Sequence, residues 1–209
     1  MTFRAVIFDL GGVVLGSPLQ AFRDYESELG LAAGTLGRAV NAAGADGAWS
    51  RLERGELAMD QFFSAFDAEM AAAGAQISAT VLMERIALGS GVRLQMVAAI
   101  RRLRASGLRT AALTNNWVNA DQQQKMDVLR DEFDVFVESA REGMRKPDPR
   151  IYQLVCERLG VTPEQAVFLD DIGQNLKAAR ALGMATIKVE DPVVALRQLE
   201  QLLALSLSS

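Results

Sequence analysis

Residues 4–14 read RAVIFDLGGVV, and this stretch decides the fold. The apolar run from Ala5 to Phe8 predicts a buried strand, because a short apolar run bounded by turn residues is typical of one. Asp9 follows where the strand would end, and Gly11 and Gly12 allow the backbone to turn sharply there. Since ligands of open parallel sheets bind beyond the carboxyl ends of the strands, Asp9 is a candidate catalytic carboxylate. An Asp that only caps a turn has the same local pattern, so the assignment depends on the rest of the chain.

From residue 91 onward, the pattern alternates between helices and strands. Apolar strands are predicted at 108–113, 133–137, 166–169 and 186–189, and helices at 94–105, 121–130, 149–159, 174–182 and 193–203. Alternation of this kind predicts an α/β fold with a Rossmann-like parallel sheet and helices on both of its faces.

Residues 16–90 carry helix-forming residues without a strand pattern, and glycines punctuate them. Helices are predicted at 21–29, 35–43, 49–54, 59–73 and 78–87, with Pro18 suited to a helix start. We therefore expect a core domain of residues 1–15 and 91–209 and an inserted helical cap domain of residues 16–90. A cap at this place would cover the crevice toward which Asp9 points and would exclude water from it.

Composition restricts the chemistry that the chain can perform. The 209 residues carry a net charge of −4 without a dense Lys/Arg cluster, so nucleic acid is not an expected partner. The absence of histidine removes Ser-His-Asp and Cys-His catalysis. The one cysteine, Cys156, lies in an apolar helical pattern and is expected to pack in the core. No apolar run reaches the ~18 residues of a membrane span, and no signal peptide is evident, so a cytoplasmic protein without a membrane partner is expected.

Polar clusters follow the predicted strands and should meet at one edge of the sheet. The clusters are Asp9, Thr114 with Asn115, Lys146, and Asp170 with Asp171. Carboxylates gathered in one crevice repel each other unless a cation lies between them, and oxygen ligands suit Mg²⁺. The lysine and the neutral donors would stabilise a phosphoryl group that Asp9 could attack. Taken singly, Lys146 could be a solvated loop lysine and the Asp pair a helix N-cap; together the clusters favour phosphoryl transfer.

Four sequence motifs, in their order along the chain, resemble those of the haloacid dehalogenase-like (HAD) superfamily of hydrolases. They are DLGGV at 9–13, LTN at 113–115, RKP at 145–147, and FLDD at 168–171 with Asn175. The resemblance covers nearly the whole chain, is weakest in residues 19–87, and is strongest to two kinds of domain. One is the N-terminal phosphatase domain of soluble epoxide hydrolases, and the other is the HAD domain fused to some acyl-CoA dehydrogenases.

This resemblance implies a Mg²⁺-dependent phosphatase that hydrolyses a small phosphorylated metabolite. Asp9 would be the nucleophile and would form an aspartyl-phosphate. Mg²⁺ would bind the Asp9 carboxylate, the Gly11 carbonyl and Asp171, and Asp170 would contact the ion mainly through water.

The remaining motif residues would serve the phosphoryl group and the acidic loop. Thr114, Asn115 and Lys146 would hold the phosphoryl oxygens, with Lys146 also paired to Asp9, and Asn175 would support the loop that carries the acidic pair. Residues 16–90 would be a cap of the C1 type. Trp49, Arg51 and Trp117 are further candidates for the pocket, with a solvated turn or simple packing as alternatives. The sequence leaves open whether two copies form a homodimer.

Gly11 departs from the family pattern, because the family's phosphatases usually carry an Asp there as general acid and base. A positioned general acid typically contributes about 10²–10⁴-fold to the rate. Cap residues or water could supply the proton instead, or the substrate could have a good leaving group. Two further alternatives remain, a phospho-ligand-binding module with little turnover and a metal-independent haloacid-type dehalogenase. The crowded pair Asp170-Asp171 argues against the dehalogenase, which needs no metal.

Overall fold

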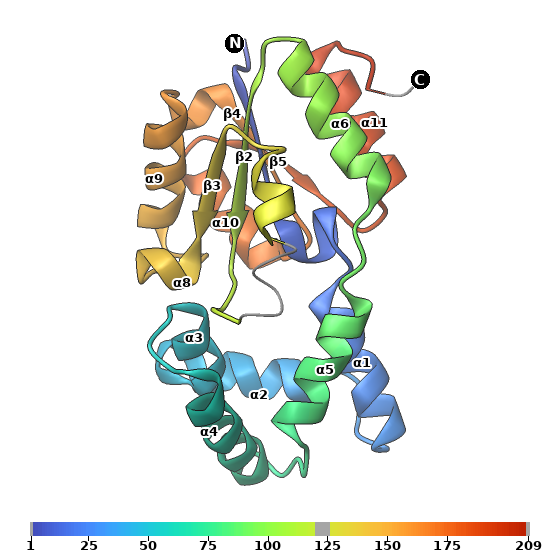
Figure 1. The fold of residues 1–209 in the computed structure, drawn as a ribbon, viewed down its shortest axis with the longest axis vertical. Helices are drawn as coiled ribbons and strands as arrows, with labels where there is room; N and C mark the ends of the chain where they lie inside the picture. The colour runs from blue at the N-terminus through green and yellow to red at the C-terminus, as the bar shows by residue number, and fades with distance from the viewer. Residues whose placement is uncertain (1, 120–125, 208–209) are drawn as a thin grey trace.

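A parallel sheet lies at the centre of the upper part of the molecule in Figure 1. In the residues that this computed structural model describes, 2–119 and 126–207, the sheet has five strands in the order β3-β2-β1-β4-β5. Their bounds are β1 Ala5–Phe8, β2 Arg109–Thr114, β3 Val135–Glu138, β4 Ala166–Asp170 and β5 Ala185–Lys188. The first strand of the chain is therefore the middle strand of the sheet, paired in parallel with β2 and β4.

Helices cover both faces of this sheet, because alternate strand side chains are apolar on both sides. Val6 and Phe8 of β1 pack toward α6 and α11, whereas Ala5 and Ile7 pack toward α9 and α10. These helices are α6 Leu94–Ala105, α9 Pro149–Leu159, α10 Gly173–Ala181 and α11 Pro192–Leu203. The predicted Rossmann-like α/β fold is confirmed. Cys156 is buried in the cluster on the α9 side, as a packing role requires, and this burial raises the pKa of its thiol to about 11.

The chain between residues 18 and 89 is mainly helical and forms a second apolar cluster around Phe62, Phe66 and Leu82, which Trp117 joins from beyond β2. Its helices are α1 Pro18–Glu28, α2 Thr35–Ala43, η2 Gly44–Asp46, α3 Ala48–Glu53, α4 Met59–Ala72 and α5 Ala79–Gly89. Leu15 and Val92 form an antiparallel bridge, and the Gly16 N–H donates to the Gly91 carbonyl at 3.0 Å. The two predicted boundaries thus lie side by side. The names core (residues 1–15 and 91–209) and cap (residues 16–90) are used below for the two predicted domains.

Short elements that the sequence did not predict lie close to the strand ends. They are the helical turn η1 Leu10–Val14, the helix α8 Ser139–Glu142 and the turn η3 Pro163–Gln165. Of the helix predicted at 121–130, residues 126–130 are helical and the others lie outside the described residues. No helix in the described part of the chain is long and apolar enough to cross a membrane.

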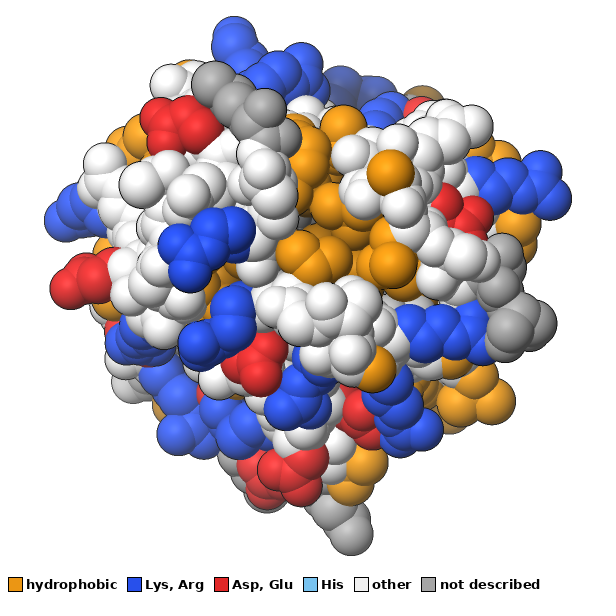
Figure 2. All heavy atoms as spheres, turned by 90° about the horizontal axis from the view of Figure 1, so that it is seen from above, with side chains coloured by type: hydrophobic (Ala, Val, Ile, Leu, Met, Phe, Trp, Pro, Cys, Tyr) orange, Lys and Arg blue, Asp and Glu red, His pale blue; other side chains and the backbone are white. Residues whose placement is uncertain are grey.

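The end of the molecule that carries both termini shows apolar side chains at its centre (Figure 2). Ala98 of α6 and Val193 and Leu196 of α11 line a surface pocket. Leu199 of α11 is fully buried, and Leu196 and Leu203 pack partly buried against the core. The apolar stripe of the last helix therefore serves the packing of α11 onto the sheet.

Candidate active site

The carboxyl ends of adjacent strands place the acidic residues side by side. Asp9 directly follows β1, and Asp170 is the last residue of the neighbouring strand β4. The Asp9 N–H donates to the Leu169 carbonyl at 2.9 Å and continues the ladder between the two strands. Oxygen atoms of Asp9, Asp170 and Asp171 lie within 4.8 Å of one another. Carboxylates that are far apart in the sequence therefore form one acidic cluster beyond the sheet.

Lys146 is a buried cation between two of these carboxylates. Its Nζ lies 2.9 Å from Asp9 Oδ1 and 2.8 Å from Asp170 Oδ2, and its side chain has no exposed surface. Burial by itself lowers the pKa of Lys146, but the carboxylates of Asp170 and Asp9 outweigh burial and raise that pKa above its usual value. Lys146 is therefore charged, and it pairs two carboxylates whose burial without a partner would be costly.

Asp9 is buried at the bottom of the site. Its Oδ1 accepts a hydrogen bond from the Leu10 N–H at 2.7 Å in addition to the contact with Lys146. Burial raises the pKa of Asp9 well above its usual value; Lys146 opposes this shift, whereas Asp170 and Asp171 add to it. A second cation facing the cluster would favour the ionised carboxylate that a nucleophile requires.

Asp170 is held in place from several sides. Its Oδ1 accepts from the Ile172 N–H at 2.7 Å, and Asn175 Nδ2 lies 3.2 Å from Oδ1 and 3.1 Å from Oδ2. The backbone carbonyl of Asn175 accepts in turn from the Tyr152 hydroxyl at 3.0 Å. Because both of its oxygens are engaged, Asp170 is better placed to orient Lys146 than to bind an ion directly.

Asp171 reaches the cluster by a close approach to the backbone of Gly12. A Cβ atom on Gly12 would lie 2.1 Å from Asp171 Oδ2, and Gly12 has a φ of +78°. Both the turn after β1 and the space for the carboxylate therefore require glycine at this position. The same Oδ2 accepts a hydrogen bond from the Ser17 hydroxyl at 3.2 Å, which ties the acidic loop to the start of the cap.

Gly12→Ala is expected to destabilise the protein by clearly more than the same change at Gly160. Gly160 has a φ of +67° with nothing within 4 Å of an added Cβ, so Gly160→Ala should cost only the left-handed backbone strain, roughly 1–2 kcal/mol. Gly12→Ala adds the collision with Asp171 and should also weaken stabilisation by Mg²⁺. Urea unfolding of both variants with and without Mg²⁺ measures the difference. Equal losses of unfolding free energy would show that Asp171 does not need this space.

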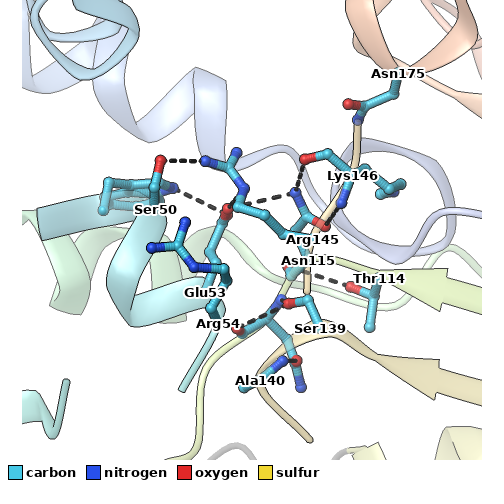
Figure 3. Close-up of polar contacts among 12 residues, drawn as sticks. Ser50, Glu53, Arg54, Thr114, Asn115, Ser139, Ala140, Arg145, Lys146 and Asn175 are labelled. Atoms are coloured by element: carbon cyan, nitrogen blue, oxygen red, sulfur yellow. Dashed lines mark hydrogen bonds and ion pairs between the residues drawn. The ribbon is translucent and has the colours of Figure 1, made fainter. Parts of the chain in front are cut away.

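Asn115 connects the end of β2 to the backbone of Lys146. Its Oδ1 accepts from the Lys146 N–H at 2.9 Å, and its Nδ2 donates to the Lys146 carbonyl at 3.1 Å. The hydroxyl of Thr114, the last residue of β2, donates to the Asn115 carbonyl at 3.4 Å. Figure 3 shows Asn115 and Lys146 facing each other from their two loops. Asn115 therefore fixes the loop that delivers the buried lysine.

A cavity of about 280 Å³ lies between the cap and the strand ends. Asp9, Lys146 and Asp171 line its polar side. Phe22 of α1, Trp49 of α3 and Trp117 form an apolar side, with ring centroids of Phe22 and Trp117 at 5.1 and 5.8 Å from Trp49. Arg51, which the sequence suggested as a pocket residue, instead pairs with Glu56 at 3.7 Å, and its side chain is 42% exposed.

Glu53 and Arg145 also line the cavity, although no pattern in the sequence assigned either of them a role. Glu53 ends α3 and is buried, and its Oε2 lies 2.7 Å from Arg145 Nε. The signal that could have found Glu53 is its spacing, since Trp49, Ser50 and Glu53 lie at i, i+1 and i+4 and share one face of a helix. All three are buried, although the stretch WSRLERGE reads as a charged turn.

The acidic cluster suits a Mg²⁺ ion. Its donors are oxygen atoms, the cluster keeps negative charge after Lys146 is counted, and Asp9, Gly11 and Asp171 line the same cavity. Asp9 and Asp171 would be the carboxylate ligands, since Asp170 is engaged by Asn175, Lys146 and the Ile172 N–H.

The sequence of the chain matches the model of one protein family. The model of the haloacid dehalogenase-like hydrolases matches residues 3–183. The chain belongs to this family. The resemblance inferred from the four motifs is confirmed, and the protein is a HAD-like hydrolase.

Relatives of this HAD-like hydrolase include phosphatases and other hydrolases. The chain is 40% identical over 99% of its length to acyl-CoA dehydrogenase family member 10 of Mus musculus, and it spans 20% of that protein. It is 37% identical over 99% of its length to bifunctional epoxide hydrolase 2 of Sus scrofa, of which it spans 40%. A sesquiterpene phosphatase of Aspergillus oryzae is 30% identical over 96% of the chain and 97% of its own length. The chain thus matches only part of the first two relatives but nearly all of the third.

Solved structures share the fold of the HAD-like hydrolase. A HAD family enzyme from Bacteroides thetaiotaomicron, in complex with magnesium and inorganic phosphate, matches with a TM-score of 0.61 at 20% identity, over 90% of this chain and 96% of that one. A dehalogenase with an intermediate complex matches with a TM-score of 0.66 at 23% identity, over 98% and 99% of the two chains. At these identities the likeness shows the fold, and chemistry has to be argued from the residues.

Proposed function

We propose that this HAD-like hydrolase is a Mg²⁺-dependent phosphatase that hydrolyses a small phosphomonoester through an aspartyl-phosphate on Asp9. The observation that supports this proposal most strongly is the buried Asp9–Lys146–Asp170 arrangement, which opens with Asp171 into one cavity. A strand end holds the carboxylate, and a fixed cation beside it offsets the charge of a phosphoryl group.

In the first step, an Asp9 carboxylate oxygen attacks the phosphorus, and the bond between phosphorus and the leaving-group oxygen breaks. Lys146 and Thr114 would hold the phosphoryl oxygens, and Lys146 stays oriented by Asp170 and Asn175. Asn115, whose side-chain amide is engaged by the Lys146 backbone and Glu53, would position Lys146 instead. In the second step, water attacks the phosphorus, which releases phosphate and restores the Asp9 carboxylate. Mg²⁺, held by Asp9, the Gly11 carbonyl and Asp171, would supply positive charge to the transferring phosphoryl group.

The protonation of the leaving group is the step that Gly11 cannot assist, since it has no side chain. Water in the cavity would protonate the departing oxygen, and a leaving group of low pKa would need this help least. The apolar side formed by Phe22, Trp49 and Trp117 would receive the organic part of the substrate. An aryl phosphate such as p-nitrophenyl phosphate meets both conditions and is the substrate of choice for a first test.

Removal of the metal is expected to stop phosphate release. Wild-type protein should release phosphate from p-nitrophenyl phosphate with Mg²⁺, and EDTA should reduce the rate at least about 100-fold, because the metal supplies several kcal/mol of charge stabilisation. Excess Mg²⁺ should restore the rate. Colorimetry of p-nitrophenolate measures all three conditions.

Two other outcomes would overturn the proposal in favour of the alternatives. Halide release from a 2-haloacid that EDTA leaves unchanged would establish the metal-independent dehalogenase. Mg²⁺-dependent binding of inorganic phosphate in calorimetry, with no release from aryl phosphates, would establish a phospho-ligand-binding module.

A further inference from the structure

The short helix α3 of the cap rests directly on the core beside the candidate active site. Gly55 follows this helix with a φ of +71°, and a Cβ atom there would lie 2.4 Å from the carbonyl oxygen of Ala140 in α8. The two backbones are therefore in contact with no room for a side chain between them. Figure 3 shows Ser50 and Glu53 of α3 facing Arg145 and Asn115 of the core across this contact.

Glu53 is the charged residue at the centre of this contact. Its Oε1 accepts from Trp49 Nε1 at 2.9 Å within the cap. Its Oε2 faces the core, 2.7 Å from Arg145 Nε and 3.4 Å from Asn115 Nδ2. The Glu53 side chain is only 8% exposed, so water screens these contacts little. One carboxylate thus joins the cap to two different core loops.

Both core partners of Glu53, Asn115 and Arg145, are connected directly to Lys146. Asn115 holds the Lys146 backbone through its amide and carbonyl at 2.9 and 3.1 Å. Arg145 precedes Lys146 in the chain, and its guanidinium also donates to the Ser50 hydroxyl of α3. The loop that carries the buried lysine is therefore fixed from the cap through Glu53.

Because Glu53 is a carboxylate, the consecutive cations Arg145 and Lys146 have different partners. Burial raises the pKa of Glu53, and Arg145 opposes this shift. The carboxylate partners Arg145 on the cap side, while Lys146 turns to Asp9 and Asp170. Without Glu53, Arg145 would be a cation in the cavity with no carboxylate of its own there, free to compete for Asp9 or for the phosphoryl group.

We propose that Glu53 is a positioning residue, which ties cap helix α3 to Asn115 and Arg145 so that Lys146 is held in its working place only when the cap is seated on the core. This inference rests on the proposed phosphatase function, and its structural part is separately measurable. Glu53 acts through its two neighbours and does not touch the reacting atoms.

Glu53→Gln tests this role, with Glu56→Gln as the matched control. The Gln keeps the size of the side chain and an acceptor for Trp49, but it loses the ion pair with Arg145. We expect kcat for p-nitrophenyl phosphate to fall about 10- to 100-fold, because small displacements of catalytic groups cost rates of this order. KM should change less than kcat, since the Gln side chain keeps the acceptor for Trp49, which lines the apolar side of the cavity. Glu56, whose side chain is 44% exposed and pairs with Arg54, should tolerate the same change without an effect on kcat.

Hydrogen exchange measures the positioning without relying on activity. The Lys146 amide bonded to Asn115 should exchange roughly tenfold faster in Glu53→Gln, and its rate should be unchanged in Glu56→Gln. Arg145→Gln provides a second route if Glu53→Gln does not fold. The double variant Glu53→Gln with Arg145→Gln should be no worse than the more affected single variant, because both remove one contact.

The outcomes separate the inference from the proposed function. If kcat and the Lys146 exchange rate both stay at wild-type values in the single variants, Glu53 is no positioning residue. A rise in KM with unchanged kcat and exchange would also overturn the role and would make Glu53 a substrate-binding residue. If wild-type protein releases no phosphate but Glu53→Gln still accelerates exchange at Lys146, the phosphatase proposal fails and the link between cap and core stands.

Discussion

Asp9→Asn is expected to abolish phosphate release while the protein stays folded. An amide cannot form the aspartyl-phosphate, so the rate should fall at least about 10⁴-fold. The substituted side chain keeps an oxygen for Lys146 and for the Leu10 N–H, which contact Asp9 Oδ1 at 2.9 and 2.7 Å. The change also removes one of three clustered carboxylates, so the melting temperature without metal should remain equal or rise.

Asp191→Asn is the matched control for this variant. Asp191 caps α11 through hydrogen bonds from Val193 and Val194, and Asn is as good an N-cap residue as Asp. Activity, melting temperature and the stabilisation by Mg²⁺ should therefore match the wild type. In Asp9→Asn, Mg²⁺ should raise the melting temperature less than in the wild type, because one ligand has lost its charge. Phosphate release at more than a few per cent of the wild-type rate would contradict the assignment of Asp9 as nucleophile.

Lys146→Met is expected to reduce stability strongly as well as activity. The substitution leaves Asp9 and Asp170 buried without the cation that lies 2.9 and 2.8 Å from them. Breaking a buried ion pair by removing one partner typically costs about 3–5 kcal/mol, because an uncompensated charge remains. Urea unfolding without metal should show a loss of this size. Mg²⁺ should recover part of the loss, since the ion supplies positive charge to the same carboxylates.

A second substitution distinguishes lost charge from lost packing in this variant. If the unpaired carboxylates cause the loss, adding Asp170→Asn to Lys146→Met should restore part of the unfolding free energy. If the loss comes only from the contact between the Lys146 ammonium and the Phe168 ring, whose centroid lies 5.4 Å from Nζ, the double variant should be no more stable than the single one. Lys177→Met, on the exposed face of α10, controls for the change in composition and should stay within about 0.5 kcal/mol of the wild type.

The parts of the molecule that could be predicted are those with strong local signals. The alternating strands and helices after residue 91 have the expected periodicity, and the parallel arrangement follows from the alternation. Asp9, Thr114 and Asp170 could be brought together because each marks the end of a strand, and strand ends share one edge of the sheet. Lys146 lies on a loop and was grouped with them as a polar cluster beside the predicted sheet, whereas the place of Asn175, on α10, came from the resemblance to the family.

The parts that could not be predicted depend on contacts between distant segments. Glu53 lies in a charged stretch whose local pattern is that of a solvated turn, and its burial involves contacts with Arg145 and Asn115 from distant loops. The need for glycine at position 12 has the same origin, since Asp171 supplies the atom that excludes a Cβ. Secondary-structure propensity depends on a residue and its neighbours in the chain. The burial of Glu53 and the need for glycine at position 12 both arise from tertiary contacts instead.

The central position of β1 in the sheet has a consequence for how a nascent chain acquires its chemistry. β1, which leads to the proposed nucleophile Asp9, is synthesised before its partner strands, which begin only at Arg109 and Ala166. Until Asp170 has been made, Asp9 has neither a complete sheet around it nor the acidic partners of its cluster. Pairing across such sequence distances gives a high contact order and slow folding. The proposed nucleophile therefore lacks its catalytic surroundings until the later strands β2 and β4 have paired with β1 on both sides.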